Sequence, residues 1–520
     1  MLTMKISKIL KRFFIILSFL VIIFSVIKLF SLGFDQKLFE SLKIHKKNPL
    51  CEDCNIIMIS LDTLGAKHLP CYGYFRDTTP NLCKFAKDNI LFQNAFSNAS
   101  WTLPSHVSMF TSLYPSYHNV IYRGDVLSPQ IPFLPEILQN NGYETYFYLP
   151  GNDTSLPIKD VYSRGITEVI PSGAGYGQPV YFNDALNSFL ANVKEGKKTF
   201  TFLHTYAVHP PYFLENNETI YTKDNVENIP LSSEQLVSLP LTEDFYQFLL
   251  SEALQKNPIS NFYEKVKEDP IFYEKFKNAK TLEEAEKIVR SQNADWVERA
   301  FIDYYFSQRN INTKRQVEYL QAMYDQRINE LDDFIGKTLI PFLENPAIKD
   351  NTMVIVTSDH GEEFMEHGSL FHQTLYDPNT RVVLIFSVPG VTNKTITAPA
   401  QSVDIVPTIL DIVGIPSKEY LFQGYSLVDP IQKNSQIKRL LFAEGFGSQA
   451  KTVRKDNWKL FLAKEGERYL PYELYDIKAD PEEKNNILSG HMDIVNEIKN
   501  ESDAYEQKWF RLLPFGQINQ

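Results

Sequence analysis

Basic residues are too few in this chain to outnumber the acidic ones. The 520 residues contain 52 Lys and Arg against 63 Asp and Glu, which gives a formal net charge of -11 at pH 7. Domains that bind nucleic acids through their phosphates are usually basic. The composition therefore argues against a nucleic-acid partner.

Cysteine is also scarce, with four residues that all lie between positions 51 and 83. Cys51 and Cys54 form a C-x-x-C pair, but no second pair follows at the spacing of a zinc site and no thioredoxin-like context surrounds it. An even number of cysteines in an exported chain permits two disulfides. We therefore expect structural disulfides or free thiols in place of a zinc site.

The chain does contain a long apolar run near its start. Residues 1–12 form a basic tail, and the mainly apolar residues 13–34 follow it with an interruption at Lys28. This order is typical of a signal peptide or signal anchor. The run can span a bilayer if Lys28 extends its amine towards the headgroups. We expect a membrane anchor, a linker over residues 35–54 and the rest of the chain outside the cytoplasm, whereas cleavage after Gly33 would release a secreted protein.

Three apolar segments have the pattern of strands that are buried on both faces. They are Asn55–Leu61, Lys198–Thr205 and Met353–Val356. Runs rich in β-branched and large apolar residues are typical of parallel strands covered by helices, and helix and strand patterns alternate between the three segments. The sequence therefore predicts an α/β fold with a large, mostly parallel sheet flanked by helices.

Polar residues stand where these strands end. Asp62 follows the first strand, His204 and His209 stand at the end of the second, and Asp359 with His360 follows the third. Ligand groups gather at the carboxyl ends of strands in open α/β sheets, and Asp with His is a common ligand set for first-row divalent metals. Taken singly, each residue is more often a turn, cap or structural residue. Of these residues, Asp62 and the pair Asp359 and His360 are candidate metal ligands.

The stretch Ser100–Pro115, SWTLPSHVSMFTSLYP, predicts a helix that begins near Thr102. Pro104 fits the first turn, and apolar residues continue the pattern. A hydroxyl at a helix N-terminus lies among unpaired backbone N–H groups, which favour a bound anion. The alternative interpretation is that Thr102 is an ordinary N-cap residue.

These stretches together resemble the sulfatase branch of the alkaline phosphatase superfamily. Two segments that carry the resemblance are SLDTLGAKHLPCYGY, which begins at Ser60, and SDHGEEFMEHG, which begins at Ser358. In the family, a run of the form Cys/Ser-x-Pro-Ser-Arg carries the nucleophile, and here Thr102 occupies its first position. The resemblance covers most of residues 55–490 except residues 214–312.

The resemblance implies roles for individual residues. Thr102 becomes the nucleophile, while His209 and His372 contact the ester oxygens or protonate the leaving group. The implied ligands of one divalent metal are Asp62, Thr102, Asp359 and His360. The implied substrate-binding residues are His106, His204 and His367. Manganese, zinc or magnesium is the expected ion, or calcium if the protein is a sulfatase in the strict sense.

The resemblance also implies a domain plan. Residues 55–430 are expected to form an alkaline phosphatase-like domain in which Asp404 is structural, and residues 431–520 a smaller subdomain with an antiparallel sheet. The helix-rich insertion 214–312 either packs its own aromatic residues as a lid or selects substrate. Its expected apolar stripe consists of Ile288, Trp296, Ala300, Phe301 and Tyr304.

Thr102 decides between the chemical alternatives. Sulfatases mature a Cys or Ser at this position into formylglycine, and threonine resembles no substrate of that maturation. The threonine-bearing relatives that build lipoteichoic acid or move phosphoethanolamine act on phosphorus. Three further departures agree: His106 replaces an Arg, His360 replaces an Asn, and Thr63 replaces an Asp.

We therefore expect a metal-dependent hydrolase or transferase that acts on a phosphate ester or phosphodiester through Thr102. The first alternative is a sulfuric ester hydrolase that acts on a sulfated glycan or small ester. The second is a non-catalytic, membrane-tethered protein that binds anions. In each case the partner is an anionic compound, which can be a glycan, a lipid head group or a small molecule.

Overall fold

The computed structural model describes residues 49–122, 124–150, 163–171, 182–210, 212, 221, 243–253, 270–290, 304, 313–445, 449–466 and 468–512. Within these ranges, no helix is both long enough and apolar enough to cross a membrane. The predicted basic tail (1–12) and apolar anchor (13–34) lie outside the described residues, as does most of the predicted linker.

An eight-stranded sheet forms the centre of the molecule, in the order β11-β2-β10-β7-β1-β6-β4-β5. Every strand runs parallel to its neighbour except β10, which is antiparallel to both β7 and β2. The strands are β1 (Asn55–Leu61), β2 (Ile90–Phe92), β4 (Tyr143–Leu149), β5 (Glu168–Pro171), β6 (Lys198–Thr205), β7 (Thr352–Thr357), β10 (Leu384–Ser387) and β11 (Lys394–Ile396). The predicted strands at 55–61, 198–205 and 353–356 are therefore all present.

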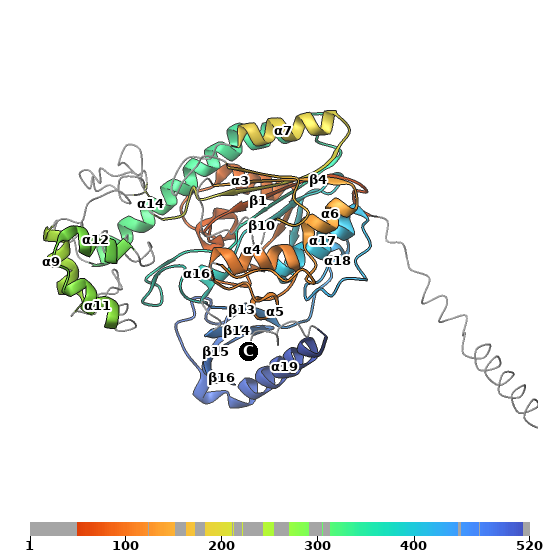
Figure 1. Ribbon diagram of the computed structural model, residues 1–520. Helices are drawn as coiled ribbons and strands as arrows, with labels where there is room; N and C mark the ends of the chain where they lie inside the picture. Colours follow the sequence, from red (N-terminus) through yellow and green to blue (C-terminus); the bar gives the residue numbers. More distant parts are fainter. Residues whose placement is uncertain are drawn as a thin grey trace, which may run out of the picture. The chain divides into compact units, whose positions relative to one another are not determined.

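Alternate residues of β1 point to opposite faces of the sheet, and each face has its own core. Ile56 and Met58 pack with the helices α4 (Thr102–Thr111), α6 (Leu134–Asn140) and α17 (Ile405–Val413). Ile57 and Ile59 pack with α3 (Pro80–Asp88), α7 (Asn183–Lys194) and α14 (Thr313–Phe334). Figure 1 shows these two groups of helices on opposite sides of the sheet. The predicted α/β class is confirmed.

A second, antiparallel sheet lies towards the C-terminus, in the order β13-β14-β15-β16. Its strands are β13 (Leu441–Glu444), β14 (Ala450–Lys455), β15 (Trp458–Glu465) and β16 (Arg468–Asp476), and the helix α19 (Met492–Leu512) follows them (Figure 1). Val453, Leu460 and Ile498 belong to the same apolar core as Ile56 and α4. The predicted C-terminal subdomain thus shares a core with the large domain.

The insertion between β6 and α14 is helical where the structure describes it. Helices α9 (Glu243–Glu252), α11 (Pro270–Lys277) and α12 (Leu282–Arg290) bury Phe245, Leu249, Phe272 and Phe276 in a small core of their own. Ile288 and Tyr304 of the predicted stripe pack on this core. The other stripe residues, Trp296, Ala300 and Phe301, lie outside the described residues.

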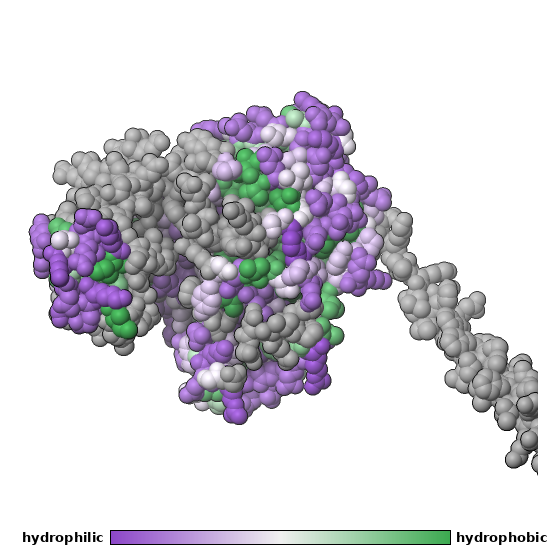
Figure 2. Space-filling model, in the orientation of Figure 1, coloured by the Kyte–Doolittle hydropathy of each residue, from purple (hydrophilic) through white to green (hydrophobic). Residues whose placement is uncertain are grey.

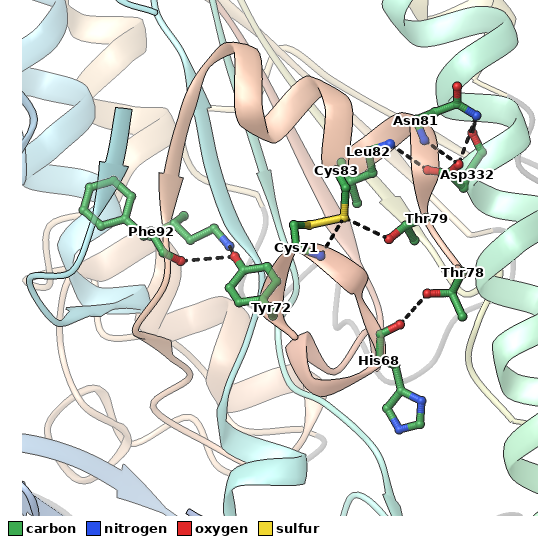
Figure 3. Close-up of a disulfide and its surroundings, with 11 residues drawn as sticks. His68, Cys71, Tyr72, Thr78, Thr79, Asn81, Leu82, Cys83, Phe92 and Asp332 are labelled. Carbon is green, nitrogen blue, oxygen red and sulfur yellow. Dashed lines mark hydrogen bonds between the residues drawn. A yellow bond between two sulfur atoms is a disulfide. The ribbon is translucent and has the colours of Figure 1, made fainter. Parts of the chain in front are cut away.

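The four cysteines form two disulfides, Cys51–Cys54 and Cys71–Cys83. The second joins the loop after β1 to α3 (Figure 3). Asp332 of α14 accepts hydrogen bonds from the backbone N–H groups of Asn81 and Leu82 at the start of α3, at 2.9 and 2.7 Å. The segment that follows Asp62 is therefore fastened covalently and by hydrogen bonds. On the face drawn in Figure 2, the coloured residues are mostly hydrophilic, with apolar ones in small groups.

Candidate active site

Three neighbouring parallel strands, β7, β1 and β6, bring the candidate residues to one edge of the sheet. Asp62 follows β1 directly, Asp359 lies two residues after β7, and His204 lies within the last two residues of β6. The Asp62 backbone N–H donates to the carbonyl of Thr205 on β6, at 3.1 Å. Carboxyl ends of parallel strands thus converge here, as the sequence predicted.

Thr102 is the first residue of α4, and Trp101 is the N-cap residue. No side chain caps the helix, so the alternative interpretation of Thr102 as an N-cap is wrong. The hydroxyl of Thr102 lies 3.4 Å from both Asp62 Oδ2 and His360 Nε2. One turn further on, the hydroxyl of Ser105 donates to the backbone carbonyl of Asp359 at 2.6 Å, which fixes the helix against the loop after β7.

Asp62, Asp359 and His360 form a buried group of metal-ligand type, with one ligand atom of each within 4.8 Å of the others. His360 Nε2 lies 3.5 Å from Asp62 Oδ1 and 3.5 Å from Asp359 Oδ2. All three side chains are 0 % exposed. We call this group the acceptor cluster, because its carboxylate oxygens and imidazole nitrogen face one another.

The hydrogen bonds around the acceptor cluster fit a bound divalent ion. His360 Nδ1 lies 3.0 Å from the carbonyl of Gly361, which holds the proton on Nδ1 and turns the lone pair of Nε2 towards the two carboxylates. Asp359 Oδ1 accepts from the backbone N–H groups of Thr63 and His360, which leaves Oδ2 facing the cluster. Buried carboxylates need a compensating positive charge, and this donor set suits a small divalent metal.

The electrostatics of Asp359 favour its charged form. Its Oδ1 accepts hydrogen bonds from two backbone N–H groups, that of Thr63 at 3.3 Å and that of His360 at 2.9 Å, and such hydrogen bonds stabilise an ionised carboxylate. Thr63 has a different role, since its hydroxyl donates to the carbonyl of Val208 at 2.9 Å. Thr63 therefore contributes a backbone N–H and no side-chain oxygen to the cluster.

Three residues next to the cluster are slightly exposed to solvent: Thr102, His209 and His372. Thr102 is 6 % exposed, His209 is 8 % exposed, and the side chain of His372 is 11 % exposed. The ring centroid of His372 lies 4.6 Å from that of His360 and 5.3 Å from that of His209. The structure therefore brings together all three residues that were predicted to take part in catalysis.

Glu362 and Tyr212 were not predicted, although they lie within the stretches SDHGEE and HPPY. Glu362 Oε1 is 3.0 Å from His372 Nδ1, and the hydroxyl of Tyr212 donates to Glu362 Oε2 at 2.6 Å. Glu362 is completely buried. Its position two residues after His360 was the signal that could have identified it.

His106 and His204 lie behind the cluster and are both 0 % exposed. His106 Nε2 is 2.9 Å from the hydroxyl of Ser60, and burial lowers the pKa of His106 to about 3, so the ring is neutral. His204 Nε2 lies 3.4 Å from Asp62 Oδ2. Both rings adjoin the cluster from inside the protein, and neither reaches solvent where a substrate would approach.

His367 is placed differently from the other candidates. Its ring stacks on Tyr376 with centroids 3.6 Å apart, Nδ1 lies 3.0 Å from Glu363 Oε1, and Nε2 lies 3.1 Å from the carbonyl of Glu482. Both ring nitrogens are thus engaged by the protein. Asp404 pairs with Arg439, whose Nη1 donates to Asp404 Oδ1 at 2.6 Å, in a buried ion pair that agrees with the expected structural role.

Comparison with known proteins adds the evolutionary context. A family model described as Sulfatase matches residues 54–415, and a model described as N-sulphoglucosamine sulphohydrolase, C-terminal, matches residues 365–508. Arylsulfatase K of Bos taurus is 31 % identical over 214 residues, which are 38 % of this chain and 39 % of that relative. N-acetylglucosamine-6-O-sulfatase of Bacteroides thetaiotaomicron is 25 % identical over 483 residues, which are 84 % of this chain and 82 % of the relative.

Solved structures share the fold at low sequence identity. An enzyme in complex with its substrate D-glucosamine-2-N,6-O-disulfate superimposes with a TM-score of 0.60 at 19 % identity, over 88 % of this chain and 97 % of the other. The phosphonate monoester hydrolase of Silicibacter pomeroyi gives a TM-score of 0.59 at 20 % identity, over 88 % and 95 %. The family match over residues 54–415 and the acceptor cluster at the strand ends lead to one conclusion: the chain is an enzyme of the sulfatase family, within the alkaline phosphatase superfamily.

Proposed function

We propose that this enzyme hydrolyses a sulfuric ester on a glycan. The observation that carries the proposal is the acceptor cluster next to the hydroxyl of Thr102, because this arrangement suits a metal-assisted attack on an anionic ester. The curated relatives are named as sulfatases, and one that matches along 84 % of this chain is named N-acetylglucosamine-6-O-sulfatase. These names favour sulfate over the phosphate ester that we expected from Thr102.

Asp62, Asp359 and His360 would hold one divalent metal, with the Thr102 hydroxyl next to it. Such an ion lowers the pKa of an adjacent hydroxyl or water and offsets the charge of the ester group. The chain itself supplies the backbone N–H groups at the start of α4, which favour an anion beside Thr102. Manganese, zinc, magnesium and calcium all remain within the proposal.

His209 and His372 would contact the ester oxygens from the exposed side. Glu362 holds the Nδ1 proton of His372, so Nε2 is the atom that would exchange a proton with the leaving group. In the proposed reaction, water attacks sulfur and loses its two protons to solvent, the bond from sulfur to the sugar oxygen breaks, and that oxygen takes a proton from His372, which recovers one from solvent. The products are a free sugar hydroxyl and sulfate.

The hydroxyl of Thr102 supports a second candidate, the hydrolysis of a phosphoester. Threonine cannot become an aldehyde, because its β-carbon carries a methyl group. An unmodified Thr102 could attack phosphorus, form a phosphothreonine and release the alcohol, after which water would cleave the intermediate. Transfer to an acceptor alcohol would follow the same first step.

We also propose that the enzyme acts outside the cytoplasm. A signal-like start over residues 1–34 supports export, with the enzyme either anchored in the membrane or released by cleavage after Gly33. A glycan of the cell envelope or its surroundings would be reached from either state.

An activity screen separates the two candidates. The purified full chain is incubated with two sulfate esters, N-acetylglucosamine 6-sulfate and 4-nitrophenyl sulfate, and with two phosphate esters, 4-nitrophenyl phosphate and bis(4-nitrophenyl) phosphate. Each substrate is tested with Mn²⁺, Zn²⁺, Mg²⁺ or Ca²⁺. We expect turnover of the sulfate esters to exceed that of the phosphate esters. Faster phosphate turnover, together with phosphorylated Thr102 found by mass spectrometry, would replace the sulfatase proposal with the second candidate. Thr102→Ser is the matched variant, because it keeps the hydroxyl and removes only the methyl group.

A further inference from the structure

A short helix, α16 (Asp377–Thr380), lies between the loops that carry the candidate metal ligands. Gly361 directly follows His360, and its N–H donates a hydrogen bond to the backbone carbonyl of Asn379 at 2.7 Å. A Cβ atom on Gly361 would lie 2.0 Å from the carbonyl oxygen of Pro378, so only glycine permits this approach. A Cβ on Gly65, in the loop after Asp62, would lie 3.3 Å from the same oxygen.

The residues that follow Pro378 also hold the segment that leads to Thr102. The carbonyl of Thr380 accepts from Ser97 N–H at 2.8 Å, and the carbonyl of Arg381 accepts from Ala66 N–H at 3.1 Å. Residues 378–381 thus contact all three stretches on which Asp62, Thr102 and Asp359 with His360 are placed. A shift of α16 would move these stretches relative to one another.

What fixes α16 is a buried ion cluster supplied by the C-terminal subdomain. Lys459 Nζ lies 2.9 Å from Asp377 Oδ1 and 2.6 Å from Glu483 Oε1, and the guanidinium of Arg454 also pairs with Asp377. Glu483 Oε2 accepts from the backbone N–H of Asp377 at 2.6 Å. Lys459 is 0 % exposed, Glu483 1 % and Asp377 4 %. We call these four residues the anchor cluster.

Residues on either side of Glu483 hold the loop that continues from His360. The carbonyl of Glu482 lies 3.1 Å from His367 Nε2, and Lys484 Nζ donates to the carbonyl of Glu366. Lys67 lies in the loop that follows Asp62, and its Nζ donates to the carboxylate of Glu482 at 3.1 Å. We expected the ring of His367 to bind substrate, but it contacts the C-terminal subdomain.

We propose that the C-terminal subdomain positions the metal ligands, with Lys459 as a positioning residue that holds the ligand loops through Asp377 and α16. The inference rests on the proposed metal site at Asp62, Asp359 and His360. It deepens that proposal by assigning a function to residues 454–484, which lie far from Asp62 in the sequence and contribute no ligand. Loss of a group that hydrogen-bonds directly to a metal ligand commonly changes metal affinity by about 10- to 100-fold. Lys459 acts through Asp377 and α16, so we expect an effect at the lower end of this range.

The test compares two variants of the full chain, Lys459→Met and Arg439→Met. Each removes one buried cation from an ion pair, but Arg439 pairs with Asp404 and its ion pair does not include α16. Mn²⁺ and, in parallel, Ca²⁺ are titrated by calorimetry at a temperature at which both variants are folded. We expect Lys459→Met to weaken binding of the tighter ion at least about tenfold, and Arg439→Met to stay within about twofold of wild type.

Hydrogen exchange of the peptide that contains Gly361 gives a second readout without metal. We expect faster exchange at this amide in Lys459→Met and unchanged exchange in Arg439→Met. If Lys459→Met does not fold, the charge-balanced double variant Lys459→Met/Glu483→Gln takes its place, with the same expected direction.

Equal losses in the two variants, or wild-type affinity and exchange in Lys459→Met, would overturn the inference and leave the proposed function standing. A wild-type chain that binds neither ion would overturn the proposed metal site and this inference with it. Loss of affinity confined to the Lys459 variants supports both.

Discussion

The protein buries charge in two places that are built in opposite ways. In the acceptor cluster, the oxygens of Asp62 and Asp359 face His360 Nε2 within 4.8 Å. In the anchor cluster, the carboxylates of Asp377 and Glu483 each lie next to a cation, Lys459 or Arg454. Both are almost fully removed from solvent, so the difference lies in the balance of charge and not in burial.

Burying an ionised carboxylate is unfavourable unless a positive charge compensates it. The anchor cluster supplies its own cations, and its effect is to hold α16. The acceptor cluster supplies too little positive charge of its own, and it fits a cation that comes from solution. The balance of charge therefore distinguishes a structural ion cluster from a candidate metal site.

The largest effect is expected from Asp359→Asn. Loss of this ligand should reduce turnover on the order of 10⁴-fold, about 5 kcal/mol of transition-state stabilisation. In the presence of a chelator, the same variant should unfold at or above the wild-type temperature, because one of two facing carboxylates loses its charge. Steady-state kinetics and thermal unfolding check both parts.

Asp325→Asn is the matched control for Asp359→Asn. The carboxylate of Asp325 is equally buried but balanced, with His68 Nδ1 at 2.7 Å and Arg76 Nη1 at 2.5 Å. We expect this variant to unfold at a lower temperature. If Asp359→Asn were destabilised as strongly as Asp325→Asn in chelator, the two kinds of cluster would not differ.

The second prediction concerns the stability of the anchor cluster. At pH 6, Lys459→Met should lower the free energy of unfolding by about 4 kcal/mol, because removing one partner leaves a buried carboxylate uncompensated. Burial lowers the pKa of Lys459 to about 7, so the amine is charged at pH 6. Lys433 forms an exposed pair with Asp429, at 3.1 Å, and Lys433→Met should change stability by less than about 0.5 kcal/mol. Urea unfolding measures both. Equal effects would mean that burial is unimportant for these pairs.

The third prediction concerns metal binding to the wild-type chain. Mn²⁺ at a hundredfold excess over its dissociation constant should stabilise the folded state by about 2.7 kcal/mol, because it binds the folded acceptor cluster and not the unfolded chain. Asp359→Asn should show no such shift in thermal unfolding. A shift of the same size in the variant would place the ion elsewhere.

The smallest effect comes from a buried histidine outside both clusters. Val120 N–H donates to His118 Nδ1 at 3.1 Å, and burial lowers the pKa of His118 to about 3. The unfolded state, with a pKa of about 6.5, binds more protons between these values, so stability falls as pH decreases from about 6.5. Between pH 7 and 5.5 this site should cost about 1 kcal/mol. His118→Asn keeps an acceptor, and its pH dependence of unfolding should be weaker than that of wild type by this amount.

Much of the fold and of the acceptor cluster was predictable from sequence, because strand ends in a parallel sheet converge. Asp62, Asp359 and Thr102 each stand next to an apolar run that identifies its strand or helix. The positions of His106 and His367 were not predictable, since burial against Ser60 and stacking on Tyr376 depend on tertiary packing.

The anchor cluster could not be inferred from local patterns either. Lys459 stands in a strand pattern where a lysine is usually solvated, and its carboxylate partners come from distant segments. Glu362 was not predicted for a simpler reason. In the segment SDHGEE, only Asp359 and His360 were interpreted as functional residues.

The grip of residues 454–484 on α16 has a consequence for biosynthesis. Asp62, Thr102 and the Cys71–Cys83 disulfide are synthesised before Lys459 and Glu483. Domains fold as they emerge, but the contacts that hold α16 join segments that are far apart in the sequence. If the proposed metal site is correct, its ligands would reach their final geometry only after the C-terminal sheet has been synthesised and has docked, and the protein would bind its metal late in folding.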